Sequence, residues 1–165
     1  QMCIRDSFII CGYGRMGAVI AKELSEQNQT FIIIEQDDEK VEYIREAGMY
    51  CIHGDATLDD TLKSASVLDA KGIAVALKTD QDNLFVTMTI RTLNSNAFLL
   101  SRCANDQNKS KLLRSGANKV INPYITGGHR MAEMLLHPEI TDIVSVTTPN
   151  DESHFRCQDT ELDTY

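Results

Sequence analysis

The feature that most constrains this chain is a glycine-rich turn placed between a short apolar run and a helical pattern. The run Phe8–Cys11 has the length and composition of a buried strand and leads directly into the turn. Gly12, Gly14 and Gly17 then follow at the GxGxxG spacing. A second apolar run ends in Glu35, about 20 residues further on, which is the context that makes this motif specific. We therefore predict a nucleotide-binding turn that joins a strand to a helix.

Each residue type in this pattern has a chemical reason. A Cβ at Gly12 or Gly14 would keep a pyrophosphate from the backbone, and Gly17 lets the helix lie close to its strand. Packing alone is the alternative role of Gly17. A helix over about residues 15–28 would present its unpaired N-terminal amides to the phosphates. Glu35 is placed to accept hydrogen bonds from ribose hydroxyls, and the acidic residues that follow it would repel a 2'-phosphate, which disfavours NADP.

The rest of the chain alternates short apolar runs with amphipathic stretches, the pattern of a parallel sheet covered on both faces. It predicts the α/β class and a Rossmann-like six-stranded parallel sheet. We expect the strands at residues 8–11, 30–35, 50–53, 72–77, 97–102 and 118–121. We expect the helices between them at residues 15–28, 38–47, 58–65, 82–94 and 107–115, with Asp80 as a candidate cap of the fourth.

The domain organisation predicted from these patterns has four parts. Residues 1–7 show no periodicity and are expected to be a disordered or non-native leader, and residues 8–124 form the Rossmann-like domain. Pro123 interrupts the pattern before a further helix at about Thr126–Leu136, within a segment set at 125–137. Residues 138–165, with a possible strand at 140–147 and a polar tail, are expected to begin a truncated C-terminal segment.

Composition and charge exclude some classes of partner. The net charge of −8 argues against extended contact with nucleic acid or anionic lipid, since both need a basic face. The apolar runs are far shorter than the roughly 18 residues that a membrane span needs, so we expect no direct membrane insertion. The five cysteines contain no CxxC pair, and most fall in apolar runs, which favours a reducing, cytoplasmic setting.

Neither a metal site nor an enzyme is predicted. His129 and His137 stand eight residues apart, two helical turns rather than the one turn of a chelating pair. No Tyr-x-x-x-Lys pair occurs, and no cysteine–histidine nucleophile stands out. A dehydrogenase fragment of the same fold is the alternative that the fold alone does not exclude.

Several short blocks together resemble one known family. They are the turn at residues 12–17, His53–Thr57, the helix start at Asp80–Leu84, Ser115–Ile121 and Pro123–Tyr124. In this order and spacing they resemble the RCK domain, the regulator of potassium conductance found in prokaryotic potassium channels and in the nucleotide-binding subunits of potassium uptake systems. Tyr124 stands where many uptake subunits have glutamate, so a cation site that uses that glutamate is not carried over.

The resemblance implies an adenine nucleotide, NAD/NADH or ATP/ADP, as the ligand. The predicted binding residues are Gly12, Tyr13, Gly14, Arg15, Met16, Gly17, Glu35, Asp55, Ala56 and Arg102. Asp55 would accept from the adenine amino group or, as the alternative, cap the next helix. Arg15 would meet the terminal phosphates, unless it is an ordinary exposed helix residue, and Arg102 lies near the phosphates in similar domains.

The function implied is non-enzymatic. The domain would bind its nucleotide in the cytoplasm, at the inner face of the membrane, and gate potassium transport by a membrane-embedded channel pore or transporter subunit. The helix after Pro123 would be the crossover helix of a homodimer or a higher RCK assembly. An RCK scaffold with an unused nucleotide pocket is a further alternative.

Overall fold

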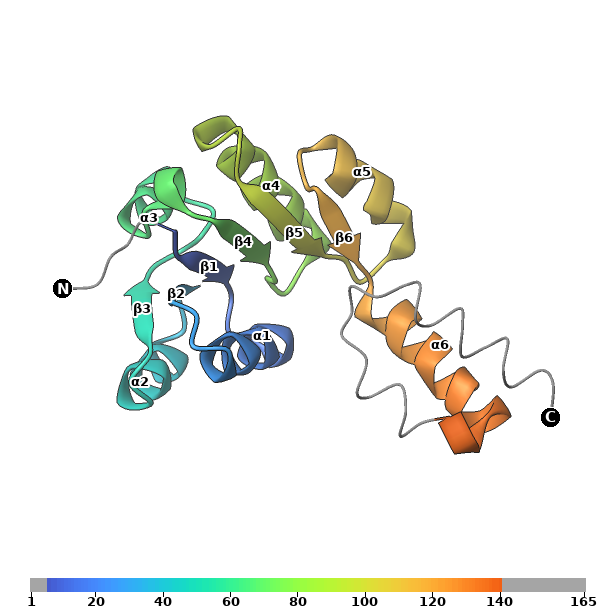
Figure 1. Ribbon diagram of the computed structural model, residues 1–165. Coiled ribbons are helices and arrows are strands. Elements are labelled where there is room, and N and C mark those ends of the chain that lie inside the picture. The colour runs from blue at the N-terminus through green and yellow to red at the C-terminus, as the bar shows by residue number, and fades with distance from the viewer. Residues whose placement is uncertain (1–5, 141–165) are drawn as a thin grey trace. The chain divides into compact units, whose positions relative to one another are not determined.

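The structure is a computed structural model, and it describes residues 6–140 of the chain. The chain divides into two compact units, residues 1–123 and 124–165. The first unit holds the whole sheet (Figure 1). Its strands are β1 (Phe8–Cys11), β2 (Phe31–Glu35), β3 (Tyr50–His53), β4 (Gly72–Val75), β5 (Phe98–Arg102) and β6 (Lys119–Ile121).

All six strands are parallel and stand in the order β3-β2-β1-β4-β5-β6. This confirms the predicted six-stranded Rossmann-like sheet. The chain leaves β1 toward β2 on one side and later returns to β1's other side with β4, where Phe8 pairs with Gly72. The order therefore reverses between β1 and β4, and ligands of open α/β sheets bind at such a point, outside the carboxyl ends of the strands.

Helices cover both faces of the sheet, as predicted. One face carries α1 (Arg15–Glu26) and α2 (Asp38–Glu46), whose Ala21 and Ile44 pack with Ile10 and Ile33 of the strands. The other face carries the helices α3 (Asp59–Ser64), α4 (Asp80–Leu93) and α5 (Lys109–Arg114), with short 3-10 turns at Val67–Asp69 and Asp106–Asn108. Figure 1 shows α1 and α2 near β1 to β3, and α4 and α5 near β4 to β6.

The core explains why the central strands read as unbroken apolar runs. Ile9 and Ile10 are adjacent in β1 and fully buried, one in the cluster on each face of the sheet. A strand that alternates its side chains between two covered faces needs apolar residues at every position. The unbroken apolar runs Phe8–Cys11 of β1 and Phe31–Ile34 of β2 thus follow from burial on both sides.

The helix caps agree with the sequence prediction only in part. Asp37 caps α2 by accepting from the Lys40 amide at 3.0 Å. The cap of α4 is Thr79, whose hydroxyl accepts from the Asp82 amide at 3.1 Å, so the expectation that Asp80 caps this helix is wrong. Asp80 is instead the first residue of the helix, where its carboxylate is free to bond elsewhere.

The described part of the second unit is mainly α6 (Pro123–Leu136), followed by a 3-10 turn at Pro138–Ile140. The helix begins at Pro123 rather than at about Thr126 as expected, because proline fits the first helical position, where no N–H bond is required. The predicted strand at 140–147, the polar tail and most of the leader lie outside the described residues. Within residues 6–140, none of the helices is long and apolar enough to cross a bilayer.

Candidate nucleotide-binding site

The three glycines of the turn meet different surroundings. Gly12 has φ +97°, and a Cβ built on it would stand 2.7 Å from the Ala76 carbonyl oxygen of the loop after β4. A Cβ on Gly17 would collide with the Gly12 carbonyl oxygen. Both glycines are therefore required by the fold, for close approach of the turn to β4 and of α1 to the turn.

Gly14 has no such requirement. Its backbone is extended, with φ −81° and ψ −161°, and nothing lies within 4 Å of the position that a Cβ would take. It is the N-cap residue of α1, a position where a serine, threonine or aspartate side chain would stabilise the helix, and it supplies no side-chain cap. The fold leaves open space beside Gly14, and this space lies at the start of α1.

The first turn of α1 is open to an anion. Ala18 is the first residue whose N–H closes a helical bond, to the Gly14 carbonyl oxygen at 2.9 Å. The amides of Arg15, Met16 and Gly17 make no backbone hydrogen bond among residues 6–140. Unpaired amides at a helix start, together with the helix dipole, favour a negative group.

Glu35 braces the glycine turn. Its carboxylate is buried at the end of β2 and accepts from the Tyr13 amide at 2.7 Å and from the Asp37 amide at 3.1 Å. The Tyr13 amide, in the predicted binding set, is thus already bonded within the protein. The Tyr13 ring lies 6.2 Å from the Tyr43 ring of α2. Each carboxylate oxygen has two lone pairs, so Glu35 keeps the capacity to accept from a ribose hydroxyl.

The loop after β3 is joined to the same edge. The Gly54 amide donates to the Glu35 carbonyl oxygen at 3.0 Å. Asp55 accepts through Oδ1 from both the amide and the hydroxyl of Thr57, at 2.9 and 2.7 Å, and these bonds close a turn. The alternative that Asp55 caps the next helix is wrong, because the N-cap residue of α3 is Leu58. Oδ2 makes no hydrogen bond to the described residues, so it keeps its capacity to accept one. The Ala56 side chain is buried in the core, so only its main chain is available for contacts at this edge.

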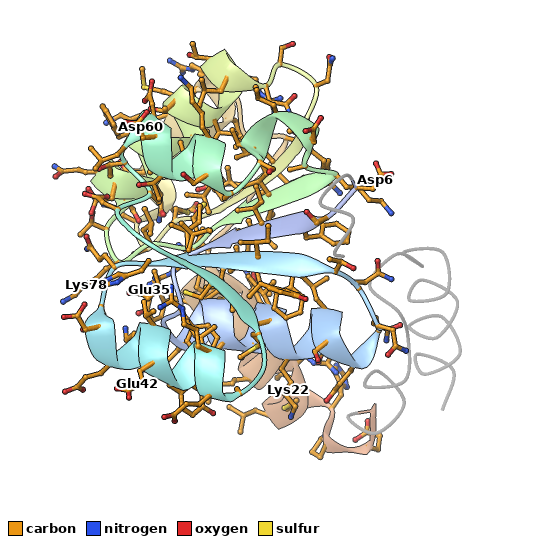
Figure 2. All side chains as sticks on the ribbon, turned by 90° about the vertical axis from the view of Figure 1, so that its left-hand side faces the viewer. Asp6, Lys22, Glu35, Glu42, Asp60 and Lys78 are labelled. Atoms are coloured by element: carbon orange, nitrogen blue, oxygen red, sulfur yellow. The ribbon has the colours of Figure 1, made fainter. Side chains whose placement is uncertain are left out.

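Basic side chains occupy the other half of the edge. Arg15 is exposed at the start of α1, and Lys78 is exposed in the loop after β4. Figure 2 shows Lys78 and Glu35 at the end of the sheet opposite Asp6, which precedes β1. Arg102 ends β5, and its Nη1 donates to the Leu77 carbonyl oxygen at 3.2 Å. Lys78 is not among the site residues predicted from the sequence, although its place just after a strand could have indicated it.

Two further residues at this edge were also missed as site residues. Asp80 accepts from the amides of Ala104 and Asn105, at 2.7 and 3.0 Å, and from the Asn108 side chain at 2.8 Å. Asn83 is buried and bonds both to the backbone of Leu77 and to the Arg102 carbonyl oxygen. Their partners are mostly main-chain atoms of distant loops, for which the sequence carries no signal.

Burial of Asp80 raises the pKa of its carboxyl group. The bonds from Asn108, Ala104 and Asn105 and the positive charge of Arg102 lower it by more, so the net pKa lies below the ordinary value of an aspartate. Asp80 is therefore ionised at neutral pH and serves as an acceptor at all three of its contacts.

The edge as a whole is polarised. The acids Glu35, Asp37 and Asp55 lie at or just after the ends of β2 and β3. The basic residues Arg15, Lys78 and Arg102 lie at or just after the ends of β1, β4 and β5. Such an arrangement suits a ligand that has hydroxyl and amino donors at one end and phosphates at the other. Cys11 lies next to the turn, but complete burial raises the pKa of its thiol to about 12, so it is no nucleophile. Among residues 6–140 no cluster of three or more metal-ligating side chains occurs.

Relatives of this chain have names that concern potassium. It is 34% identical over 151 residues to potassium channel protein 1 and 39% identical over 145 residues to probable potassium channel protein 2, both of Methanocaldococcus jannaschii. These matches cover 90% and 86% of this chain. The chain spans less than half of each relative, 45% and 42% of their lengths.

Solved structures share the fold. The TrkA-N domain of the inner membrane protein ybaL from Escherichia coli superposes with a TM-score of 0.77, covering 81% of this chain and 99% of that one at 22% identity. The GsuK channel bound to NAD gives a TM-score of 0.66 at 22% identity over 71% of this chain and 21% of that one. The Shewanella denitrificans Kef CTD in AMP-bound form gives 0.65 at 20% identity over 96% and 92%.

The family follows from a match along most of the chain. Residues 8–123 match the TrkA-N domain, from the first residue of β1 to the first residue of α6. The resemblance to RCK domains drawn from the short sequence blocks is confirmed by this match and by the potassium channel relatives. This chain belongs to the TrkA-N domain family.

Proposed function

We propose that this chain is a regulatory domain that binds an adenine nucleotide and thereby gates potassium transport. The observation that carries the proposal is Gly14. The fold gives no steric reason for glycine there, and helix capping favours a polar side chain, so the missing Cβ is best explained by a ligand that needs the space.

The polarised edge supports an adenine nucleotide as the ligand. The open amides of α1 and the guanidinium groups of Arg15 and Arg102 suit phosphates, and Glu35 and Oδ2 of Asp55 suit the ribose and the adenine amino group. Structures of the same fold include one bound to NAD and one in AMP-bound form, which agrees with this class of ligand.

The potassium channel relatives support a membrane partner. In this proposal the domain works in the cytoplasm at the inner face of the membrane, without catalysing a reaction, and acts on a channel pore or a transporter subunit. A nucleotide that binds one arrangement of the domain better than another shifts the population toward it, and this shift biases the gate.

Exposed apolar residues support a homodimer or a higher assembly. On α4, Phe85 and Met88 are 54% and 52% exposed, and Leu113 of α5 is 42% exposed. These two helices lie on the same face of the sheet, as Figure 1 shows. Residues of this kind, gathered on one face, are typical of a protein interface.

The substitution Gly14→Asp tests the ligand part of the proposal. The new carboxylate would occupy the phosphate space with a negative charge and abolish nucleotide binding. Since aspartate is a better N-cap than glycine, stability should be unchanged or rise by roughly a few tenths of a kcal/mol. Calorimetric titration with AMP, ADP, ATP, NAD and NADH measures binding, and thermal melting measures stability.

Gly127→Asp is the matched control. It adds the same charge in α6, at a glycine that also has open space around its Cβ position, and it should bind nucleotide as the unaltered chain does. Nucleotide binding that survives Gly14→Asp would contradict the site assignment. In the intact transport system, Gly14→Asp should remove the effect of nucleotide on rubidium flux into proteoliposomes, whereas Gly127→Asp should leave that effect in place.

A further inference from the structure

We infer that Asp80 and Asn83 form a clamp that positions Arg102 toward the phosphates of the ligand, so that the site distinguishes nucleotides by their number of phosphates. This inference rests on the proposed function. It goes beyond that function in two ways. It names two positioning residues outside the glycine turn, and it names the number of phosphates as the property of the ligand that they help to distinguish.

Asp80 forms the first half of the clamp. From the first turn of α4, its Oδ1 accepts from the Ala104 amide at 2.7 Å, and its Oδ2 accepts from the Asn105 amide at 3.0 Å and the Asn108 side chain at 2.8 Å. One carboxylate thus holds the whole turn that follows β5. Because all three are bonds to a charged acceptor, they are stronger than neutral ones.

Asn83 forms the second half, one helical turn further along α4. Its Oδ1 accepts from the Leu77 amide at 2.8 Å, and its Nδ2 donates to the carbonyl oxygens of Leu77 at 3.3 Å and Arg102 at 3.1 Å. The residue is 1% exposed. The buried side-chain amide of Asn83 thus bonds both to the loop after β4 and to the end of β5, and it fixes the distance between them.

Arg102 lies between the two halves. Its backbone is held by Asn83, and one guanidinium nitrogen donates to the Leu77 carbonyl oxygen at 3.2 Å. Within residues 6–140 this is the only hydrogen bond of the guanidinium, and the group forms no ion pair there. The remaining N–H groups of a five-donor fork are therefore left to a ligand.

The clamp and plain electrostatics predict opposite effects. Asp80 places a negative charge close enough to Arg102 for each to influence the other. If charge alone mattered, neutralising Asp80 would strengthen the binding of a phosphate group near Arg102. If Asp80 acts by holding the turn after β5, neutralising it releases the guanidinium and weakens that binding, because a misplaced fork loses its paired bonds.

The experiment compares AMP with ADP by calorimetry on the unaltered chain and its variants, below the melting temperature of each. Asp80→Asn should weaken ADP about tenfold and AMP less than about twofold, the size expected for loss of a charged hydrogen bond. Asp82→Asn is the matched control. It removes the same charge from the same turn of α4 at an exposed residue, and it should weaken neither nucleotide.

Two more variants separate positioning from folding. Asp80→Glu keeps the charge but displaces the carboxylate by one methylene, so it should show the same loss of preference for ADP. Arg102→Gln should also lose that preference, and adding Asp80→Asn to it should cause no further loss, since Asp80 acts through Arg102.

The outcomes distinguish the inference from the proposed function. Tighter ADP binding by Asp80→Asn, equal loss of AMP and ADP, or additive losses in the double variant would overturn the inference and leave the nucleotide site standing. Failure of the unaltered chain to bind any nucleotide would overturn the proposed function, and the inference with it.

Discussion

At the residue scale, Arg91 of α4 shows a charged side chain used as a bracket for the backbone. Its Nε and Nη2 both donate to the Gly116 carbonyl oxygen, at 3.1 and 2.7 Å. Its Nη1 donates to the carbonyl oxygens of Asn94, Ser95 and Ala97. The planar guanidinium thus joins the loop before β5 to the loop before β6.

We expect Arg91→Lys to lower the free energy of unfolding by about 2–4 kcal/mol, because an ammonium group cannot reach carbonyls in three directions and leaves several of them unpaired. Urea unfolding followed by circular dichroism measures this. Arg114→Lys, at an exposed residue of α5, is the control and should change stability by less than about 0.5 kcal/mol. Equal stability of the two variants would contradict the bracket.

The carboxyl group of Asp80 predicts a pH dependence of stability. Since its folded pKa lies below the unfolded value of about 3.9, the folded state favours the ionised form. Its contribution is fully present above the unfolded pKa and is lost as pH falls through the folded pKa. The stability difference between the unaltered chain and Asp80→Asn should therefore shrink as the pH falls below the unfolded pKa and through the lower folded pKa. Urea unfolding at a series of pH values checks this, and a constant difference would contradict it.

At the scale of elements, the strands of the sheet could be predicted from the sequence, whereas the residues at which they end could be predicted less well. Apolar runs such as Phe31–Glu35 identify strands because two covered faces demand apolar residues throughout. The run predicted at 72–77 ends at Val75, where it has run out of partner: the Ala76 amide still bonds to the carbonyl oxygen of Cys11, but Cys11 is the last residue of β1. Such an end depends on a neighbouring strand and not on the residue itself.

The same limit applies to the site. The glycine turn and Glu35 were predictable because their spacing reflects one local unit of strand, turn and helix. Thr79 and Asp80 are adjacent polar residues, and either can cap a helix, so sequence could not decide between them. The backbone partners of Asp80 and Asn83 are distant in the sequence and come close only because β4 and β5 are neighbours in the sheet, which no local pattern indicates.

At the scale of the whole molecule, the exposed apolar face of α4 and α5 predicts self-association. We expect Phe85→Glu to shift this chain toward the monomer in sedimentation velocity measured over a range of concentrations, because a charge at an apolar interface is costly to bury. Tyr43→Glu is the control. Tyr43 is 60% exposed on α2, on the other face of the sheet, and its substitution should leave the distribution unchanged. A shift in both variants or in neither would contradict an interface on α4 and α5.

The bond from the Tyr13 amide to Glu35 also has a consequence for the cost of binding. A loop that becomes ordered only around its ligand gives up conformational entropy at that moment, roughly 1–2 kcal/mol for each residue fixed. Here the glycine turn is held to the end of β2 within the folded domain, so its conformational entropy is lost during folding and not on binding. In the proposed function, more of the contact energy then contributes to affinity, because the nucleotide would meet a turn that is already ordered.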